Sequence, residues 1–160
     1  MIKLRPYQTD IIDSVRSSYK GGHQRVLVVA PTGSGKTVMF CDVAQKARMN
    51  GKRTIVLVHR QELIDQTSRT LTGFDVPHGV IAAGRSSDGS ELIQIASVQT
   101  LIRRIDRIEK PDLIVIDEAH HAIAGSWRKG VERFSDARVL GVTATPERLD
   151  GKGLSDVFED

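Results

Sequence analysis

Apolar positions along the chain gather into five short runs, at residues 26–30, 54–58, 92–96, 113–116 and 139–142. Continuous runs of this length, rich in valine and isoleucine, are typical of strands that are buried on both faces of a parallel sheet. Longer stretches with helical spacing separate them. The pattern therefore predicts a three-layer α/β fold, with a mostly parallel sheet of at least five strands, right-handed crossovers and helices on both faces.

The N-terminal stretch predicts an amphipathic helix that opens at Pro6 and ends before two glycines. Its apolar positions recur at helical spacing and are expected to face the core: Tyr7, Ile11, Val15 and Tyr19. For Gln8, a solvated side chain is the simpler expectation. An amide also donates to and accepts from adenine at once, so Gln8 is a candidate for selecting ATP over GTP.

The first apolar run leads into PTGSG at residues 31–35 and then into a predicted helix from Lys36. In a phosphate-binding loop, glycines let backbone N–H groups point at an anion, the lysine reaches the β and γ phosphates, and the hydroxyl of Thr37 ligates Mg²⁺. Ala30 replaces the first glycine of the usual pattern. An ordinary turn is the alternative, but the strand before and the helix after favour a nucleotide site. Its predicted members are Thr32, Gly33, Ser34, Gly35, Lys36 and Thr37.

Two adjacent acids, Asp117 and Glu118, end the fourth apolar run. Carboxylates at the end of a buried strand are costly unless a cation or catalysis uses them. Asp117 is placed to hold Mg²⁺, and Glu118 to orient and deprotonate the water that attacks the γ-phosphate. Together with the phosphate loop, the pair predicts an ATPase site.

Polar residues also follow the other predicted strands. Arg60 is expected at the carboxyl end of the sheet, where ligands bind in α/β proteins. Ser97 is suited to cap the helix that follows it, and this role alone accounts for it. Thr143 and Thr145 are placed either to sense the γ-phosphate or to cap the next turn.

Composition narrows the class of protein only slightly. The chain has 160 residues, suits a single domain, and is 39% hydrophobic and 27% charged, as expected for a folded α/β protein. A net charge of +3 is compatible with a polyanionic partner but is also common. Cys41 is the single cysteine and is expected to be a buried hydrophobe. With neither a membrane-length apolar run nor a leader pattern after Met1, a cytoplasmic location is expected.

Six segments occur in the order of the motifs of superfamily 2 helicases. They are RPYQ at 5–8, APTGSGKT at 30–37, VHRQELIDQ at 58–66, ASVQTL at 96–101, DEAHH at 117–121 and TATPERLDGKGL at 143–154. The chain most resembles the DEAD/DEAH-box DNA helicase-like proteins grouped with XPB and with the motor subunits of type III restriction enzymes. The resemblance covers nearly the whole chain.

This resemblance implies a RecA-like first motor domain at residues 1–150 and the start of a linker at 151–160. It implies adenine contacts by Gln8 and Arg5, and a strand 139–142 that lies between the phosphate-loop strand and the DEAH strand. It assigns the coupling of hydrolysis to movement to His120, Thr143 and Thr145. It also implies contacts with the nucleic-acid backbone, without sequence readout, by Arg60, Ser97, Gln99 and Thr100.

A second RecA-like domain, which supplies the arginine finger in this family, would have to complete the motor. The isolated chain is therefore expected to be a monomer that binds ATP and Mg²⁺, hydrolyses ATP slowly, and separates no strands. DNA is favoured over RNA as the partner, and an RNA helicase domain stays an alternative. The chain could instead be a stand-alone binding module without ATP turnover, or a small P-loop kinase, against which DEAHH and TATP argue.

Overall fold

A computed structural model describes residues 3–30, 35–58, 60–82, 91–117 and 132–143. Helices and strands alternate from α1 to β3 in this part of the chain, and no helix in it is long and apolar enough to cross a membrane. The elements are α1 Pro6–Lys20, β1 Arg25–Val29, α2 Lys36–Met49, β2 Thr54–Val58, α3 Gln61–Gly73, β3 Gly79–Ile81, β4 Ile93–Ser97, α4 Val98–Arg103, the 3₁₀ helix η1 Ile105–Arg107, β5 Leu113–Asp117 and β6 Arg138–Thr143.

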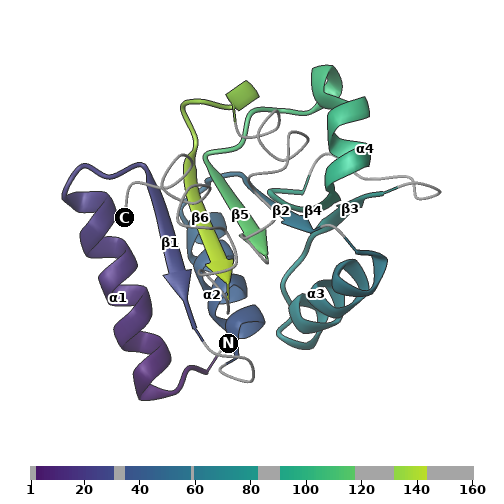
Figure 1. The fold of residues 1–160 in the computed structure, drawn as a ribbon. Coiled ribbons are helices and arrows are strands. Elements are labelled where there is room, and N and C mark those ends of the chain that lie inside the picture. Colours follow the sequence, from purple (N-terminus) through teal and green to yellow (C-terminus); the bar gives the residue numbers. More distant parts are fainter. Residues whose placement is uncertain (1–2, 31–34, 59, 83–90, 118–131, 144–160) are drawn as a thin grey trace.

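The six strands form one sheet in the order β1-β6-β5-β2-β4-β3, and every neighbouring pair is parallel (Figure 1). The predicted parallel α/β sheet is confirmed. So is the expected position of the strand at residues 139–142, because β6 pairs with β1 on one side and with β5 on the other. The sequence did not reveal β3, whose three residues are too few to form a distinct apolar run.

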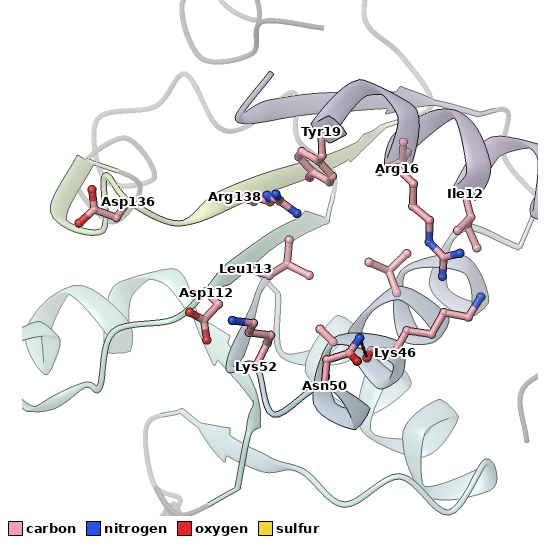
Figure 2. Close-up of a pocket in the computed structure, with 13 residues that line it drawn as sticks. Ile12, Arg16, Tyr19, Lys46, Asn50, Lys52, Asp112, Leu113, Asp136 and Arg138 are labelled. Carbon is pink, nitrogen blue, oxygen red and sulfur yellow. Dashed lines mark hydrogen bonds between the residues drawn. The ribbon is translucent and has the colours of Figure 1, made fainter. Parts of the chain in front are cut away.

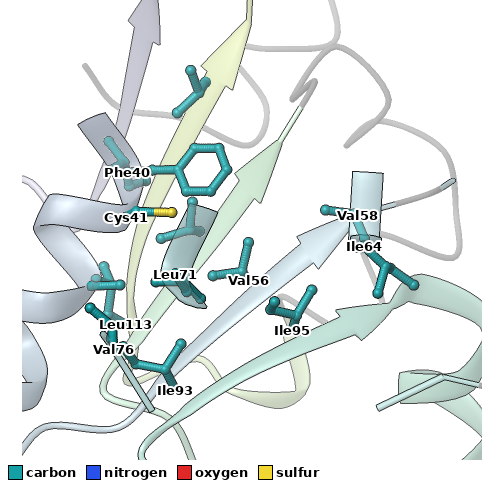
Figure 3. Packing of buried hydrophobic residues seen from close by; sticks show 14 of the residues in the cluster. Phe40, Cys41, Val56, Val58, Ile64, Leu71, Val76, Ile93, Ile95 and Leu113 are labelled. Atoms are coloured by element: carbon teal, nitrogen blue, oxygen red, sulfur yellow. The ribbon is translucent and has the colours of Figure 1, made fainter. Parts of the chain in front are cut away.

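Each central strand contributes side chains to two hydrophobic cores. On one face Val56 and Val58 of β2 pack with Phe40 of α2 and Leu71 of α3 (Figure 3). On the other face the alternate residues of β2 pack with Leu101 of α4. Successive side chains of a strand point to opposite faces, so a strand buried on both faces is apolar throughout.

The strand β1 departs from that expectation. It pairs only with β6 among the described strands, and Val29 near its end keeps half of its surface, 50%, exposed. The prediction that this run is buried on both faces is therefore wrong. An apolar run does not reveal whether its strand lies at the centre of a sheet or at its side.

The buried face of α1 agrees with the prediction at Val15 but is shifted by one residue nearer the start of the helix. Gln8, Ile12 and Val15 are buried, whereas Tyr7 is 40% exposed. Tyr19 is partly buried, and its hydroxyl donates a 2.8 Å hydrogen bond to the Val139 carbonyl of β6. The expectation of a solvated Gln8 is wrong, because only 4% of its surface is exposed.

Candidate functional site

The carboxyl ends of β1, β6 and β5 lie next to one another. Val29 of β1 is in register with Thr143 of β6, and Asp117 of β5 is in register with Val142. The Ala30 N–H donates to the Thr143 carbonyl at 2.9 Å, which continues the pairing up to the start of the phosphate loop. Since neighbouring strands are about 4.8 Å apart, the backbones of β1 and β5, which have β6 between them, are separated by roughly 10 Å.

The helix α2 begins directly after Gly35, whose φ of +78° lies in the left-handed region. A residue with a side chain is strained in this conformation. A Cβ at Gly35 would in addition overlap Nε2 of Gln8. The glycine is thus required both by its own backbone and by its neighbour, and it leaves the N–H groups at the start of α2 open to an anion.

Gln8 connects the start of α1 to Gly35 through hydrogen bonds. Its Oε1 accepts a 2.8 Å hydrogen bond from the Arg5 N–H, and its Nε2 donates to the Gly35 carbonyl at 3.5 Å. Both polar atoms of the amide are therefore engaged with backbone groups. Arg5 itself is exposed. Contact of Gln8 and Arg5 with adenine stays a prediction, whereas the support that Gln8 gives to Gly35 is a role that the sequence did not reveal.

The ammonium group of Lys36 lies over the end of β1, where Nζ donates to the Ala30 carbonyl at 3.5 Å. Lys36 and Thr37 are the first two residues of α2. A cation, a glycine-capped helix N-terminus and a hydroxyl are thereby brought together at one point. This combination fits the phosphates of a nucleotide, because the lysine and the helix dipole both stabilise negative charge.

Asp117 has 5% of its surface exposed and ends β5 close to α2. Burial, together with the negative charge of Asp117, raises the pKa of the Cys41 thiol on α2 to about 12. Cys41 is therefore a protonated, buried hydrophobe, as expected. Carboxylate and hydroxyl oxygens are the ligands that Mg²⁺ prefers, so Asp117 and Thr37 fit a magnesium ion, which stays a prediction.

Thr143 is fully buried at the end of β6, between the phosphate-loop strand and β5. It is the only predicted coupling residue within the described part of the chain. Six predicted site residues lie outside the described part: Thr32, Gly33, Ser34, Glu118, His120 and Thr145.

The predicted nucleic-acid residues lie at the ends of the neighbouring strands β2 and β4, where Val58 is in register with Ser97. The Ser97 hydroxyl accepts the Thr100 N–H at 3.2 Å and caps α4, as its sequence position predicted. Thr100 is buried, with 2% of its surface exposed. Arg60 and Gln99 are exposed. These two side chains are therefore the most exposed members of the group, and Ser97 is partly exposed.

Residues 1–148 match the family described as type III restriction enzyme, res subunit. The protein IRC3 of Saccharomyces cerevisiae, whose name describes an ATP-dependent helicase, is 37% identical over 98% of this chain and 25% of its own length. The DNA 3'-5' translocase XPB2 of Sulfurisphaera tokodaii is 29% identical over 94% of this chain and 33% of its own length. The chain thus spans about a quarter to a third of these relatives.

Solved structures show the same fold at low sequence identity. The Sulfolobus solfataricus SWI2/SNF2 ATPase core in complex with dsDNA matches 98% of this chain and 36% of its own, with a TM-score of 0.75 and 18% identity. The UvsW helicase from bacteriophage T4 matches 98% of this chain and 57% of its own, with a TM-score of 0.76 and 16% identity. These matches confirm the RecA-like fold, and the family match confirms the resemblance that the six motifs indicated. The chain belongs to the family of the type III restriction enzyme res subunit, a family of superfamily 2 helicase and translocase motors.

Proposed function

We propose that this chain is the ATP-binding N-terminal motor domain of a DNA helicase or translocase, and that it hydrolyses ATP with Mg²⁺ when a second RecA-like domain completes its site. One observation carries the proposal. The glycine-capped start of α2, with Lys36, lies at the same end of the sheet as the buried carboxylate of Asp117.

Each of these groups has a task in phosphoryl transfer. The N–H groups at the start of α2 and the Lys36 ammonium bind the β and γ phosphates. Thr37 and Asp117 would hold Mg²⁺, which neutralises charge on the phosphates. Glu118 follows Asp117 in the sequence and is assigned the orientation and deprotonation of the attacking water. His120, Thr143 and Thr145 would couple hydrolysis to movement.

The second domain accounts for the rest of the activity. An arginine finger raises phosphoryl-transfer rates by roughly 10³ to 10⁵. The chain spans 25% of IRC3, which leaves room in such relatives for a second domain. We assign residues 1–150 to the motor domain and 151–160 to the start of the linker. The isolated chain is then a monomer with slow ATP turnover.

DNA is the proposed partner of the strand ends of β2 and β4. The name of XPB2 describes a DNA translocase, and the SWI2/SNF2 core was solved with dsDNA. Arg60 and Gln99, which are exposed, would contact the sugar-phosphate backbone. The hydrogen bond from the Thr100 N–H to the Ser97 hydroxyl would hold the start of α4 in place. Such contacts suit a motor that moves over any sequence.

The test measures ATP binding and steady-state ATPase activity with Mg²⁺, with and without single- and double-stranded DNA or RNA. We expect Mg²⁺-dependent ATP binding with little turnover. Lys36→Ala is expected to weaken binding by roughly tenfold or more, because a charge-assisted contact contributes about 1.5–3 kcal/mol. Lys20→Ala, at the exposed end of α1, is the matched control.

Three results would distinguish the proposed motor domain from its competitors. Absence of ATP binding by the folded chain would contradict the proposal. Strand separation by the isolated chain would contradict the need for a second domain. ATP binding that never leads to turnover, even with DNA and an added second domain, would favour a binding module.

Glu118→Gln is the control that removes the proposed base and should abolish any turnover seen.

A further inference from the structure

A cavity of about 780 Å³ lies at the end of the sheet where β5 and β6 begin (Figure 2). This end is opposite the end at which β1 leads to Lys36. The walls of the cavity come from α1, from the end of α2 with the turn that follows, and from the starts of β5 and β6. The cavity begins along α2 at Val43, seven residues beyond Lys36, which corresponds to roughly 10 Å at 1.5 Å per residue. It is therefore a different place from the nucleotide site.

Basic side chains from four separate segments line this cavity, over an apolar floor. The basic residues are Arg16, Lys46, Lys52 and Arg138, and the acidic ones are Asp112 and Asp136. The floor includes Ile12, Val15, Val43 and Leu113. An apolar floor with a few charged groups at the rim is the usual arrangement of a small-molecule site, and such sites have volumes of about 300–1,000 Å³.

Two of the six charges are already engaged. Lys46 Nζ pairs with Asp42 Oδ2 at 2.8 Å, and Asp112 Oδ2 accepts the Arg53 N–H at 2.9 Å. Within the described ranges, no carboxylate forms an ion pair with Arg16, Lys52 or Arg138. Three cations without an ion pair to a described carboxylate therefore line one cavity together with the carboxylates of Asp112 and Asp136, and the net charge of the lining stays positive, which favours an anion.

Arg138 is held in place before any ligand binds. Its guanidinium lies 5.2 Å from the centroid of the Tyr19 ring, and the Tyr19 hydroxyl is bonded to the Val139 carbonyl at 2.8 Å. Burial raises the pKa of Tyr19, so its hydroxyl stays a neutral donor. A guanidinium stacked on an aromatic ring keeps its N–H groups for an oxyanion, and a fixed group loses little entropy on binding.

The ends of helices offer a simpler explanation for part of the positive charge. Cations stabilise the carbonyl groups at a helix C-terminus, and Lys46 and Lys52 flank the end of α2. This explanation does not extend to Arg138, which begins β6, or to Arg16, which precedes the last turn of α1. The two arginines therefore carry the inference.

We propose that this cavity binds a small organic phosphate. Its apolar body would lie on the floor near Leu113, and its phosphate would be bound by Arg16 and Arg138, with Lys52 contributing charge. The volume of about 780 Å³ lies in the range of small-molecule sites, which favours a small ligand over a continuous nucleic-acid backbone. This site is independent of the proposed ATP site.

The test is a titration of the isotope-labelled chain with naphthyl phosphate, followed by amide NMR. We expect saturable shifts at Asn50, Lys52 and Leu113, beside the cavity, separate from shifts at Gly35 and Lys36. Arg16→Gln and Arg138→Gln should each weaken binding by roughly tenfold, as expected for a charge-assisted hydrogen bond. Arg48→Gln on α2, outside the cavity lining, should have no effect. Lys36→Ala should also leave the binding of naphthyl phosphate in the cavity unchanged.

Matched probes identify what is recognised. Naphthol lacks the phosphate and inorganic phosphate lacks the ring, so both should bind more weakly than naphthyl phosphate. Shifts confined to the phosphate loop, or equal binding of naphthol, would overturn the proposal. Tighter binding of a single-stranded oligonucleotide or of an oligo-glutamate peptide at the same amides would overturn it as well, because the cavity would then serve a macromolecule. Loss of ATP binding in Lys36→Ala would not affect these outcomes, because they concern only the cavity.

Discussion

The two ends of the sheet are built in different ways. At the carboxyl end the functional groups are buried and fixed by backbone contacts: Gln8, Asp117 and Thr143 each have 5% or less of their surface exposed, and Gly35 has a left-handed φ. At the amino end the arginines that line the cavity, Arg16 and Arg138, are exposed.

The difference shows how each end responds to substitution. A site made from backbone groups depends on the conformation of every residue around it, so a single added methyl group disturbs it. A site made from exposed side chains loses one contact at a time and leaves the fold intact. We therefore expect large, coupled effects at the carboxyl end and small, separable effects at the amino end.

The largest effect is expected for Gly35→Ala. The left-handed backbone would be strained by about 1–2 kcal/mol, and the new Cβ would displace Gln8. We expect a lower free energy of unfolding in urea and a loss of ATP affinity of more than roughly tenfold.

Gly51→Ala is the matched control for this variant. Gly51 also has a left-handed φ, +74°, but no atom lies within 4 Å of a Cβ placed there. Gly51→Ala should lower the free energy of unfolding by the backbone strain alone, and its ATP affinity should be unchanged. Equal loss of ATP affinity in both variants would refute a specific role for the contact between Gly35 and Gln8.

The second largest effect is expected for Gln8→Ala, which removes the hydrogen bonds of a buried amide to the Arg5 N–H and the Gly35 carbonyl. Leaving buried polar partners unsatisfied costs about 1–3 kcal/mol, so the free energy of unfolding should fall by that amount and ATP should bind less tightly. Gln61→Ala, at the exposed first position of α3, should change stability by less than about 0.5 kcal/mol. Similar stability of the two variants would show that the Gln8 contacts do not hold the loop.

The smallest effect is expected at the amino end, for Arg138→Gln. An exposed cation–π contact contributes about 0.5–1 kcal/mol, so the stability loss should not exceed that range and ATP binding should be unchanged. Urea unfolding measures the stability loss, and ATP titration measures the affinity. A stability loss larger than that of Gln8→Ala would contradict the comparison, because the amino end would then contribute as much to stability as the carboxyl end.

The sequence predicted those features that depend on local pattern. Strands buried on both faces are apolar at most positions, so β2, β4, β5 and β6 were recognisable. The start of α2 and the cap at Ser97 follow from glycine and serine chemistry at helix ends. The position of β6 between β1 and β5 was implied only by the resemblance to helicases.

Features that depend on distant neighbours were missed. The burial of Gln8 arises from Gly35, 27 positions further along, and no local spacing indicates it. The exposure of Val29 follows from the place of β1 at the side of the sheet. The cavity combines arginines and lysines from four segments, each of which resembles an ordinary surface residue in its own stretch.

The insertion of β6 between β1 and β5 has a consequence for how the protein is made. The first described strand pairs with the last described strand, since Arg25 is in register with Val139. At about 5–20 residues per second, synthesis of β6 follows that of β1 by roughly 6–23 seconds. Until then the phosphate loop follows a strand whose partner has not been made, so the nucleotide site is completed only near the end of synthesis of this domain.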